Sequence, residues 1–185
     1  MGRAKGRRGA PRRGWLTWRL AAAALSAGPV AGALGAPVLT ASVAMADLNG
    51  RPVGTVQLTS SSNGVVFRVE LRDLPPGVHG FHIHAAGVCA PPFASAGGHF
   101  NPDSTDHGFL NEDGPHAGDL ANITVGNDGR AVAEMFSPLV TLSPDAQGSL
   151  VDGAKTSFVL TEGPDDYRTN PDGRSGRRIA CGAVR

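Results

Sequence analysis

The residues best suited to chemistry are six histidines and one aspartate in a short part of the sequence. The histidines are His79, His82, His84, His99, His107 and His116, and Asp119 follows three residues after the last of them. A histidine taken alone is as often a surface or hydrogen-bonded residue as a functional one. Six histidines with a carboxylate instead favour a metal centre, because neutral imidazole binds zinc and copper well.

The spacing of these residues predicts which of them lie on a strand and which lie in a loop. His82 and His84 are two residues apart in a strand-like run, so their side chains share one face and can hold one metal. His107 and His116 lie in a long polar segment, and Asp119 is expected to begin the next strand. A carboxylate among histidines fits tetrahedral zinc.

Short runs of alternating apolar and polar residues predict the strands that must position these side chains. The predicted strands span residues 38–46, 53–59, 65–71, 80–84, 119–125, 129–136, 157–160 and 179–184. Asn63-Gly64 between two such runs is a strong hairpin signal. Segments 85–118 and 163–177 are polar and lack periodicity, which is typical of functional loops. This pattern predicts an all-β sandwich or barrel of about eight strands.

Charge divides the chain into two parts. Residues 1–36 contain seven Lys or Arg and no acid, so the remainder has 17 − 7 = 10 basic against 16 acidic residues, a net charge of −6. An acidic domain argues against a nucleic-acid partner. The basic start and the apolar stretch from Leu20 to about Ala36 predict an export signal over residues 1–36, ahead of a domain over residues 37–185.

The predicted signal places the protein in the periplasm, in the cell envelope or outside the cell. Arg12-Arg13 fits a twin-arginine signal, and the cleavage site is left open. The alternatives are an uncleaved membrane anchor or a plain tail. Cys89 and Cys181 are the two cysteines, and in an exported protein such a pair predicts a disulfide, with two buried thiols as the alternative.

Four motifs together resemble the signatures of copper/zinc superoxide dismutases, in the order and at the spacings of that family. They are Gly80-Phe81-His82-Ile83-His84, Gly98-His99-Phe100-Asn101-Pro102, His116-Ala117-Gly118-Asp119-Leu120 and Gly176-Arg177-Arg178-Ile179-Ala180-Cys181-Gly182. The resemblance covers about residues 38–185. It implies an immunoglobulin-like Greek-key sandwich that holds one zinc and one copper and dismutes superoxide to oxygen and hydrogen peroxide.

The resemblance also implies a role for each matching residue. Copper would be bound by His82, His84 and His99, and zinc by His99, His107, His116 and Asp119. Arg178 would attract superoxide and, with the bridging His99, act in catalysis. Asp165 would link His82 to His107 behind the metals, Cys89 and Cys181 would form the disulfide, and His79 would be structural. The alternatives are that Arg178 is a solvated base and that Asp165 is part of a solvated turn.

One position departs from the family pattern. The family has a fourth copper-binding histidine before its second polar loop, and here the matching run is Thr161-Glu162-Gly163-Pro164-Asp165-Asp166-Tyr167. Thr161 takes the place of the histidine, and a hydroxyl is a poor copper ligand. Glu162 faces the other side of a regular strand and would need a bulge or a loop bend to reach the metal.

Two hypotheses follow for the function. The first is a superoxide dismutase with weak or unusual copper binding and impaired activity. The second is a non-enzymatic, zinc-structured protein that binds copper loosely or binds another partner. The expected substrate of the first is superoxide, a small anion. A homodimer, and membrane attachment through an uncleaved N-terminal segment, are further alternatives that the sequence leaves open.

Overall fold

The computed structural model describes residues 1–2, 37–153 and 155–185. The chain divides into two units, Met1–Gly35 and Ala36–Arg185, and the strands given below belong to the second. The predicted export signal therefore lies almost entirely outside the described residues. No helix in the described part of the chain is long and apolar enough to cross a membrane.

Short strands joined by turns and loops make up the described domain, with a single turn of 3₁₀ helix. In chain order the elements are β1 (Thr40–Asp47), β2 (Pro52–Ser61), β3 (Gly64–Leu71), β4 (Gly77–His79), β5 (Phe81–His84), η1 (Ala94–Ala96), β6 (Ile123–Val125), β7 (Ala131–Ser137), β8 (Ser157–Thr161) and β9 (Arg178–Ala183).

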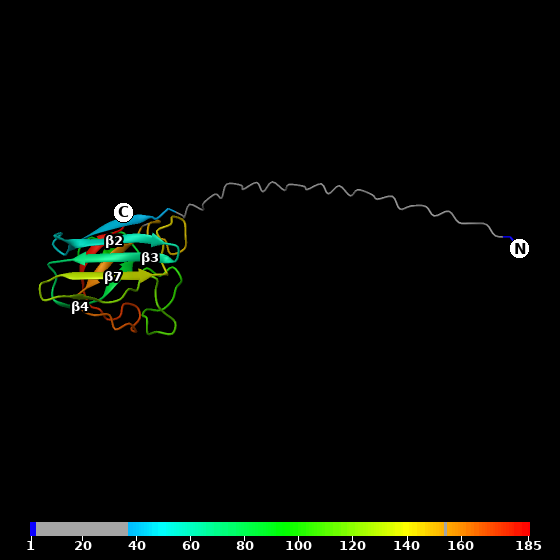
Figure 1. Ribbon diagram of the computed structural model, residues 1–185. Coiled ribbons are helices and arrows are strands. Elements are labelled where there is room, and N and C mark those ends of the chain that lie inside the picture. Colours follow the sequence, from blue (N-terminus) through cyan, green and yellow to red (C-terminus); the bar gives the residue numbers. More distant parts are fainter. Residues whose placement is uncertain (3–36, 154) are drawn as a thin grey trace. The chain divides into compact units, whose positions relative to one another are not determined.

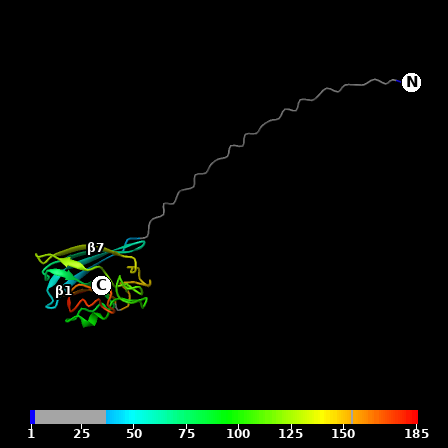
Figure 2. The same ribbon diagram turned by 90° about the horizontal axis from the view of Figure 1, so that it is seen from below.

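Seven of these strands form one antiparallel sheet in the order β5-β8-β9-β1-β2-β3-β7, and β4 pairs with β6 in a second, two-stranded sheet. β2, β3 and β7 lie side by side, and the large sheet curls around the core as a half-barrel (Figures 1 and 2). The prediction of an all-β Greek-key domain is confirmed.

The core follows from the two-residue period of the strands. In β3, Val65, Phe67, Val69 and Leu71 are buried, whereas Arg68 and Glu70 between them are exposed. Alternation of this kind places one face of the sheet against the core and the other in solvent.

Apart from shifts of one or two residues at strand ends, two differences from the predicted strands concern the neighbourhood of the histidines. Asp119 does not begin a strand, because β6 starts only at Ile123, and Asp119 instead forms an isolated antiparallel bridge with His82. The three residues of β4 were not predicted, since a strand this short, directly after Pro75-Pro76, shows no period of its own. The bridge brings Asp119 beside β5.

Candidate metal centre

β5 supplies two of the histidines and separates them from the core. Phe81 and Ile83 belong to the main hydrophobic cluster. His82 and His84 alternate with them, so they leave the opposite face of the strand, and both are buried. The segments around Phe100 and Gly118 cover this strand, because Phe100 N donates to Ile83 O and Ile83 N donates to Gly118 O.

The first metal group consists of His99, His107, His116 and Asp119, whose ligand atoms all lie within 4.8 Å of one another. Asp119 Oδ1 is 2.8 Å from His99 Nδ1, 3.0 Å from His107 Nδ1 and 3.3 Å from His116 Nδ1. Ligands at about 2.0–2.1 Å from a tetrahedral zinc are about 3.3 Å apart, so the separations match that ion. Asp119 Oδ2 is held by the backbone N–H groups of Gly108 and His116 at 2.9 and 3.0 Å.

The second metal group consists of His82, His84 and His99. His82 and His99 stack with ring centroids 4.1 Å apart. Because His99 Nδ1 faces Asp119, its Nε2 is left for this second group. His99 therefore belongs to both groups and could offer one nitrogen to each.

The hydrogen bonds of the rings decide which nitrogens are free to bind. His82 Nε2 donates to Asp165 Oδ2 at 2.8 Å, and His84 Nδ1 donates to Gly97 O at 2.9 Å. The opposite nitrogens, His82 Nδ1 and His84 Nε2, are buried without a hydrogen-bond partner, and so is His116 Nδ1. Buried unpaired nitrogens are rare in folded proteins, and one metal ion at each of the two groups would satisfy all three.

The charges of the site also suit metal binding. Burial lowers the pKa of His84 to about 2 and the pKa of His99 to about 4, so both rings are neutral at pH 7. Burial opposes the charge of His107 as well, but its hydrogen bonds to Asp119 and Asp165 outweigh burial and raise its pKa to about 9. Burial would raise the pKa of Asp119, but hydrogen bonds from His107 and His99 lower it well below its usual range. A metal at the first group must therefore displace a proton from His107.

Asp165 joins the two groups from behind. Its Oδ1 accepts from His107 Nε2 at 3.0 Å and its Oδ2 accepts from His82 Nε2. The carboxylate is buried rather than part of a solvated turn. Burial would raise the pKa of Asp165, but hydrogen bonds from His107 and His82 lower it below its usual value, so it stays charged and fixes both rings.

Two residues that the sequence did not single out hold Asp165 in place. Asn122 Oδ1 accepts from Asp165 N at 2.9 Å and Asn122 Nδ2 donates to Asp165 O at 2.9 Å. Tyr167 Oη in turn accepts from Asn122 N at 2.7 Å. Tyr167 belongs to the Pro-Asp-Asp-Tyr run, but nothing in the sequence marks Asn122, since its contact spans 43 residues.

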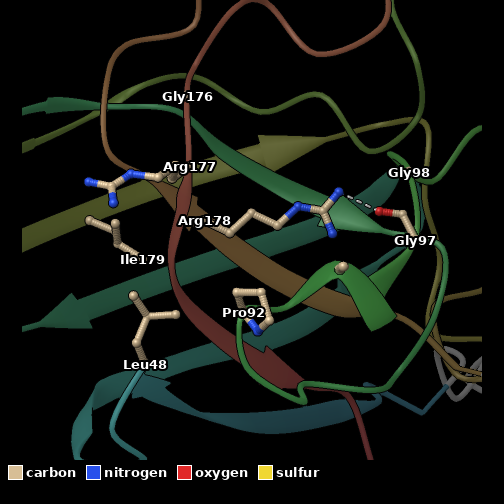
Figure 3. Close-up of a pocket in the computed structure, with 9 residues that line it drawn as sticks. Leu48, Pro92, Gly97, Gly98, Gly176, Arg177, Arg178 and Ile179 are labelled. Carbon is tan, nitrogen blue, oxygen red and sulfur yellow. Dashed lines mark hydrogen bonds between the residues drawn. The ribbon is translucent and has the colours of Figure 1, made fainter.

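Arg178 is docked beside the second group. Its Nη1 donates to Phe93 O at 2.6 Å and its Nη2 donates to Gly97 O at 2.7 Å, the same carbonyl that His84 uses. Figure 3 shows its guanidinium directed at Gly97, whereas Arg177 points the opposite way. Arg178 lines a pocket of about 750 Å³ that also includes Gly98, the residue before His99.

The disulfide between Cys89 and Cys181 is present, with an S–S distance of 2.05 Å. It joins the first loop to β9, three residues beyond Arg178. Phe93 and Ala96 pack with it and with Val159 in a small cluster of buried residues. The disulfide therefore ties down the segment whose carbonyls hold Arg178.

Within the described residues, the side chains of Thr161 and Glu162 form no hydrogen bond or ion pair with either metal group. Thr161 Oγ1 lies 3.1 Å from Gly80 O and 3.1 Å from Gly163 O, so its hydrogen is donated to backbone. The pairing of β8 with β9 is irregular between Leu160 and Thr161, as a bulge would require. Glu162 nevertheless turns to Arg177, with its Oε2 2.8 Å from Arg177 Nε and 2.8 Å from Arg177 Nη2.

Comparison with known proteins decides the family. Residues 53–184 match the family described as copper/zinc superoxide dismutase. This chain is a member of that family. It is 41% identical over 149 residues, 80% of this chain and 87% of the relative, to "Superoxide dismutase [Cu-Zn] 2" of Aquifex aeolicus (strain VF5).

Solved structures agree with the assignment to the copper/zinc superoxide dismutases. A crystal structure of a SOD-like protein from Bacillus subtilis is 40% identical, covers 78% of this chain and 97% of that chain, and has a TM-score of 0.75. The Cu/Zn superoxide dismutase from Brucella abortus is 30% identical over 80% of this chain and 100% of that chain, with a TM-score of 0.65. Copper and zinc are the cofactors of this family, and the two side-chain groups fit them.

The role of Asp165 leads to a first prediction. Asp165→Asn is expected to weaken zinc binding about tenfold, since the four side chains of the first metal group remain but an amide cannot accept hydrogen bonds from both His82 and His107. Competition with a chromophoric chelator measures the affinity. Asp166→Asn is the matched control, because Asp166 is exposed and binds only residues of its own loop. Equal zinc affinity in both variants would contradict the prediction.

Proposed function

We propose that this chain dismutes superoxide to oxygen and hydrogen peroxide, with its activity limited by a copper site that has three histidine ligands. The observation that carries the proposal is that His99 belongs to both groups of metal-binding side chains. Zinc would be held by His99, His107, His116 and Asp119, and copper by His82, His84 and His99. Bound copper supplies a redox couple that takes an electron from one superoxide ion and returns it to a second, so that two superoxide ions and two protons yield O₂ and H₂O₂.

The residues of the chain have separate tasks in this reaction. Asp165 and Gly97 O hold His82 and His84 with their free nitrogens toward copper. His99 is neutral and buried. Its Nε2 would carry a proton only while copper is not bound to that nitrogen, and that proton could then pass to the product. Arg178 keeps a positive charge beside the site and attracts the anion, and its two hydrogen bonds to carbonyls fix its direction.

Thr161 is the reason to expect impaired activity. All six histidines of the sequence have places in the structure, and His79 bonds to backbone: its Nδ1 lies 2.7 Å from Thr161 O and its Nε2 lies 2.9 Å from Pro75 O. In the described part of the chain, the group around His82 contains no fourth histidine, cysteine or carboxylate. Three imidazoles hold copper less firmly than four.

Metal content provides a second prediction. After loading with both metals and exhaustive dialysis, the protein is expected to keep one zinc per chain and to lose most of its copper. The physical reason is that the first metal group, proposed for zinc, offers four ligands, whereas the second, proposed for copper, offers three. Elemental analysis measures the result. Copper retained at one per chain would show that three histidines, or a ligand from elsewhere, bind it firmly.

The proposed activity itself is tested by following superoxide decay after adding protein loaded with zinc and copper. Protein loaded with zinc alone is the control for decay without a redox metal. Faster decay that depends on bound copper supports the proposal. Decay equal to that of the zinc-only protein, at measured copper occupancy, would overturn it.

A non-enzymatic role is less well supported, since relatives over most of the chain are named as dismutases. We also propose that the protein is exported. The disulfide suits an oxidising compartment, and relatives of this type come from bacteria such as Caulobacter vibrioides and Photobacterium leiognathi.

A further inference from the structure

The second polar loop, residues 163–177, is closed at its base by a small network of hydrogen bonds. Gly80 N donates to Gly163 O at 2.8 Å, Gly163 N donates to Ser175 O at 2.9 Å, and Glu162 N donates to Arg177 O at 2.8 Å. These bonds join the two ends of the loop to each other and to the start of β5. Asp165, which holds His82 and His107, lies just inside this closure.

Thr161 adds the side chain that connects this network. Its hydroxyl lies between Gly80 O and Gly163 O, 3.1 Å from each, and the residue is buried. Its backbone takes part as well, because Thr161 N donates to Gly80 O at 3.0 Å and Thr161 O accepts from His79 Nδ1. Thr161 is thus bonded to the residue before β5 and to the first residue of the loop.

The packing around the hydroxyl is tight. A Cβ atom added to Gly80 would lie 2.6 Å from Thr161 Oγ1 and 2.9 Å from His82 Cε1, so residue 80 must be glycine for this arrangement to form. The side chain of Thr161 therefore lies beside the ring of His82 but bonds to backbone. The hydroxyl therefore adds to the backbone bonds that close the loop, and it does so without a bound metal.

We propose that Thr161 is a positioning residue for the zinc site: its hydroxyl closes the second polar loop in the absence of copper, so that Asp165 keeps His107 oriented toward zinc. This inference rests on the ligand assignment of the proposed function. It means that zinc affinity in this chain does not depend on whether copper is bound. Thr161, which replaces a copper ligand of the family, would thus act on the zinc site through Asp165 and His107.

The test compares zinc affinity in copper-free protein for the wild type, Thr161→Val and Thr161→Ser. Valine keeps the shape and removes the hydroxyl, and serine restores it. Both carbonyls retain a backbone donor in Thr161→Val, so no buried acceptor is left unpaired and the fold should persist. Thr161→Val is expected to bind zinc about fivefold more weakly, the loss of one buried hydrogen bond, and Thr161→Ser within about twofold of wild type.

A matched control separates positioning from general stability. Thr156 is also buried, and its hydroxyl donates to Leu150 O at 2.9 Å, away from the second loop. Thr156→Val should lower the melting temperature and leave zinc affinity unchanged. Hydrogen exchange of residues 163–177 should accelerate in Thr161→Val and not in Thr156→Val. If Thr161→Val fails to fold, Thr161→Ala against Thr161→Ser makes the same comparison.

The inference is overturned if zinc affinity is the same with and without the hydroxyl, if serine fails to restore it, or if Thr156→Val weakens zinc binding equally. It is also overturned if loading copper raises the zinc affinity of the wild type several-fold. None of these measurements uses superoxide decay. A chain without dismutase activity can therefore still confirm the role of Thr161, and an active chain can still refute it.

Discussion

Replacing Thr161 with histidine is expected to raise dismutase activity in copper-loaded protein tenfold or more. The side chain at 161 lies beside the ring of His82, since both would contact a Cβ placed on Gly80. An imidazole starting there can supply the fourth nitrogen that the copper group lacks, and copper favours such ligands. The rate of superoxide decay, measured per bound copper, reports the change.

A control must show that the gain in activity comes from the imidazole and not from any larger polar side chain at position 161. Thr161→Asn introduces a polar group of similar reach that is a poor copper ligand, so it should give no increase. The histidine variant should also hold copper through dialysis that strips the wild type. An unchanged rate per copper would mean that the fourth ligand is unimportant here or that another group provides it.

In the Thr161→His variant, the affinity for zinc should depend on whether copper is bound. Thr161→His removes the hydroxyl bonds to Gly80 O and Gly163 O, so its zinc affinity should fall when copper is absent and recover when copper is bound. The wild type should show no such dependence. The threonine and histidine versions of the site thus differ in how the second loop is closed, as well as in the copper ligands.

Opening the disulfide between Cys89 and Cys181 is expected to be the largest change in stability. The bond joins residues 92 apart in the sequence. A cross-link over a loop of that length restricts the unfolded chain by roughly 4–5 kcal/mol. For a domain of this size, that corresponds to a melting temperature lower by about 10–20 °C, measured by thermal unfolding with and without reductant.

The double variant Cys89→Ser, Cys181→Ser separates loss of the cross-link from effects of the reductant. Its melting temperature should match that of the reduced protein. Because the cross-link anchors the segment containing Phe93 O and Gly97 O, Arg178 should also be held less firmly, and superoxide decay by copper-loaded protein should slow. An unchanged melting temperature in both the reduced and the double-variant protein would show that packing around Phe93 alone holds this segment.

Local patterns in the sequence were sufficient to predict the strands and to predict which side chains lie on each face of a strand. The alternation of Phe81 and Ile83 with His82 and His84 predicted one core face and one metal-binding face, and β5 has both. The predicted hairpin joins β2 and β3, but its two turn residues are Ser62 and Asn63, and Gly64 is already the first residue of β3. Periods of two residues and turn residues act over a few positions, so a sequence can display them directly.

Composition predicted where the two polar loops lie, but it did not predict the contacts that their residues make. The expected strand start at Asp119 was wrong, because the carboxylate is held by Gly108 and His116 and the backbone pairs only locally with His82. Asn122 was missed altogether, since its partner Asp165 is 43 residues away. Contacts of this kind depend on how two loops meet, which no local period encodes.

The sequence by itself determined the all-β class, the cysteine pair, the two polar loops and the set of histidines available to metals. The tertiary structure decided which arginine stands beside the second metal group, since Arg177 is paired with Glu162 and Arg178 is docked on carbonyls. It also decided that the Thr161 hydroxyl faces backbone oxygens. The physical reason is that hydrogen bonds have direction, and direction exists only after distant segments have packed together.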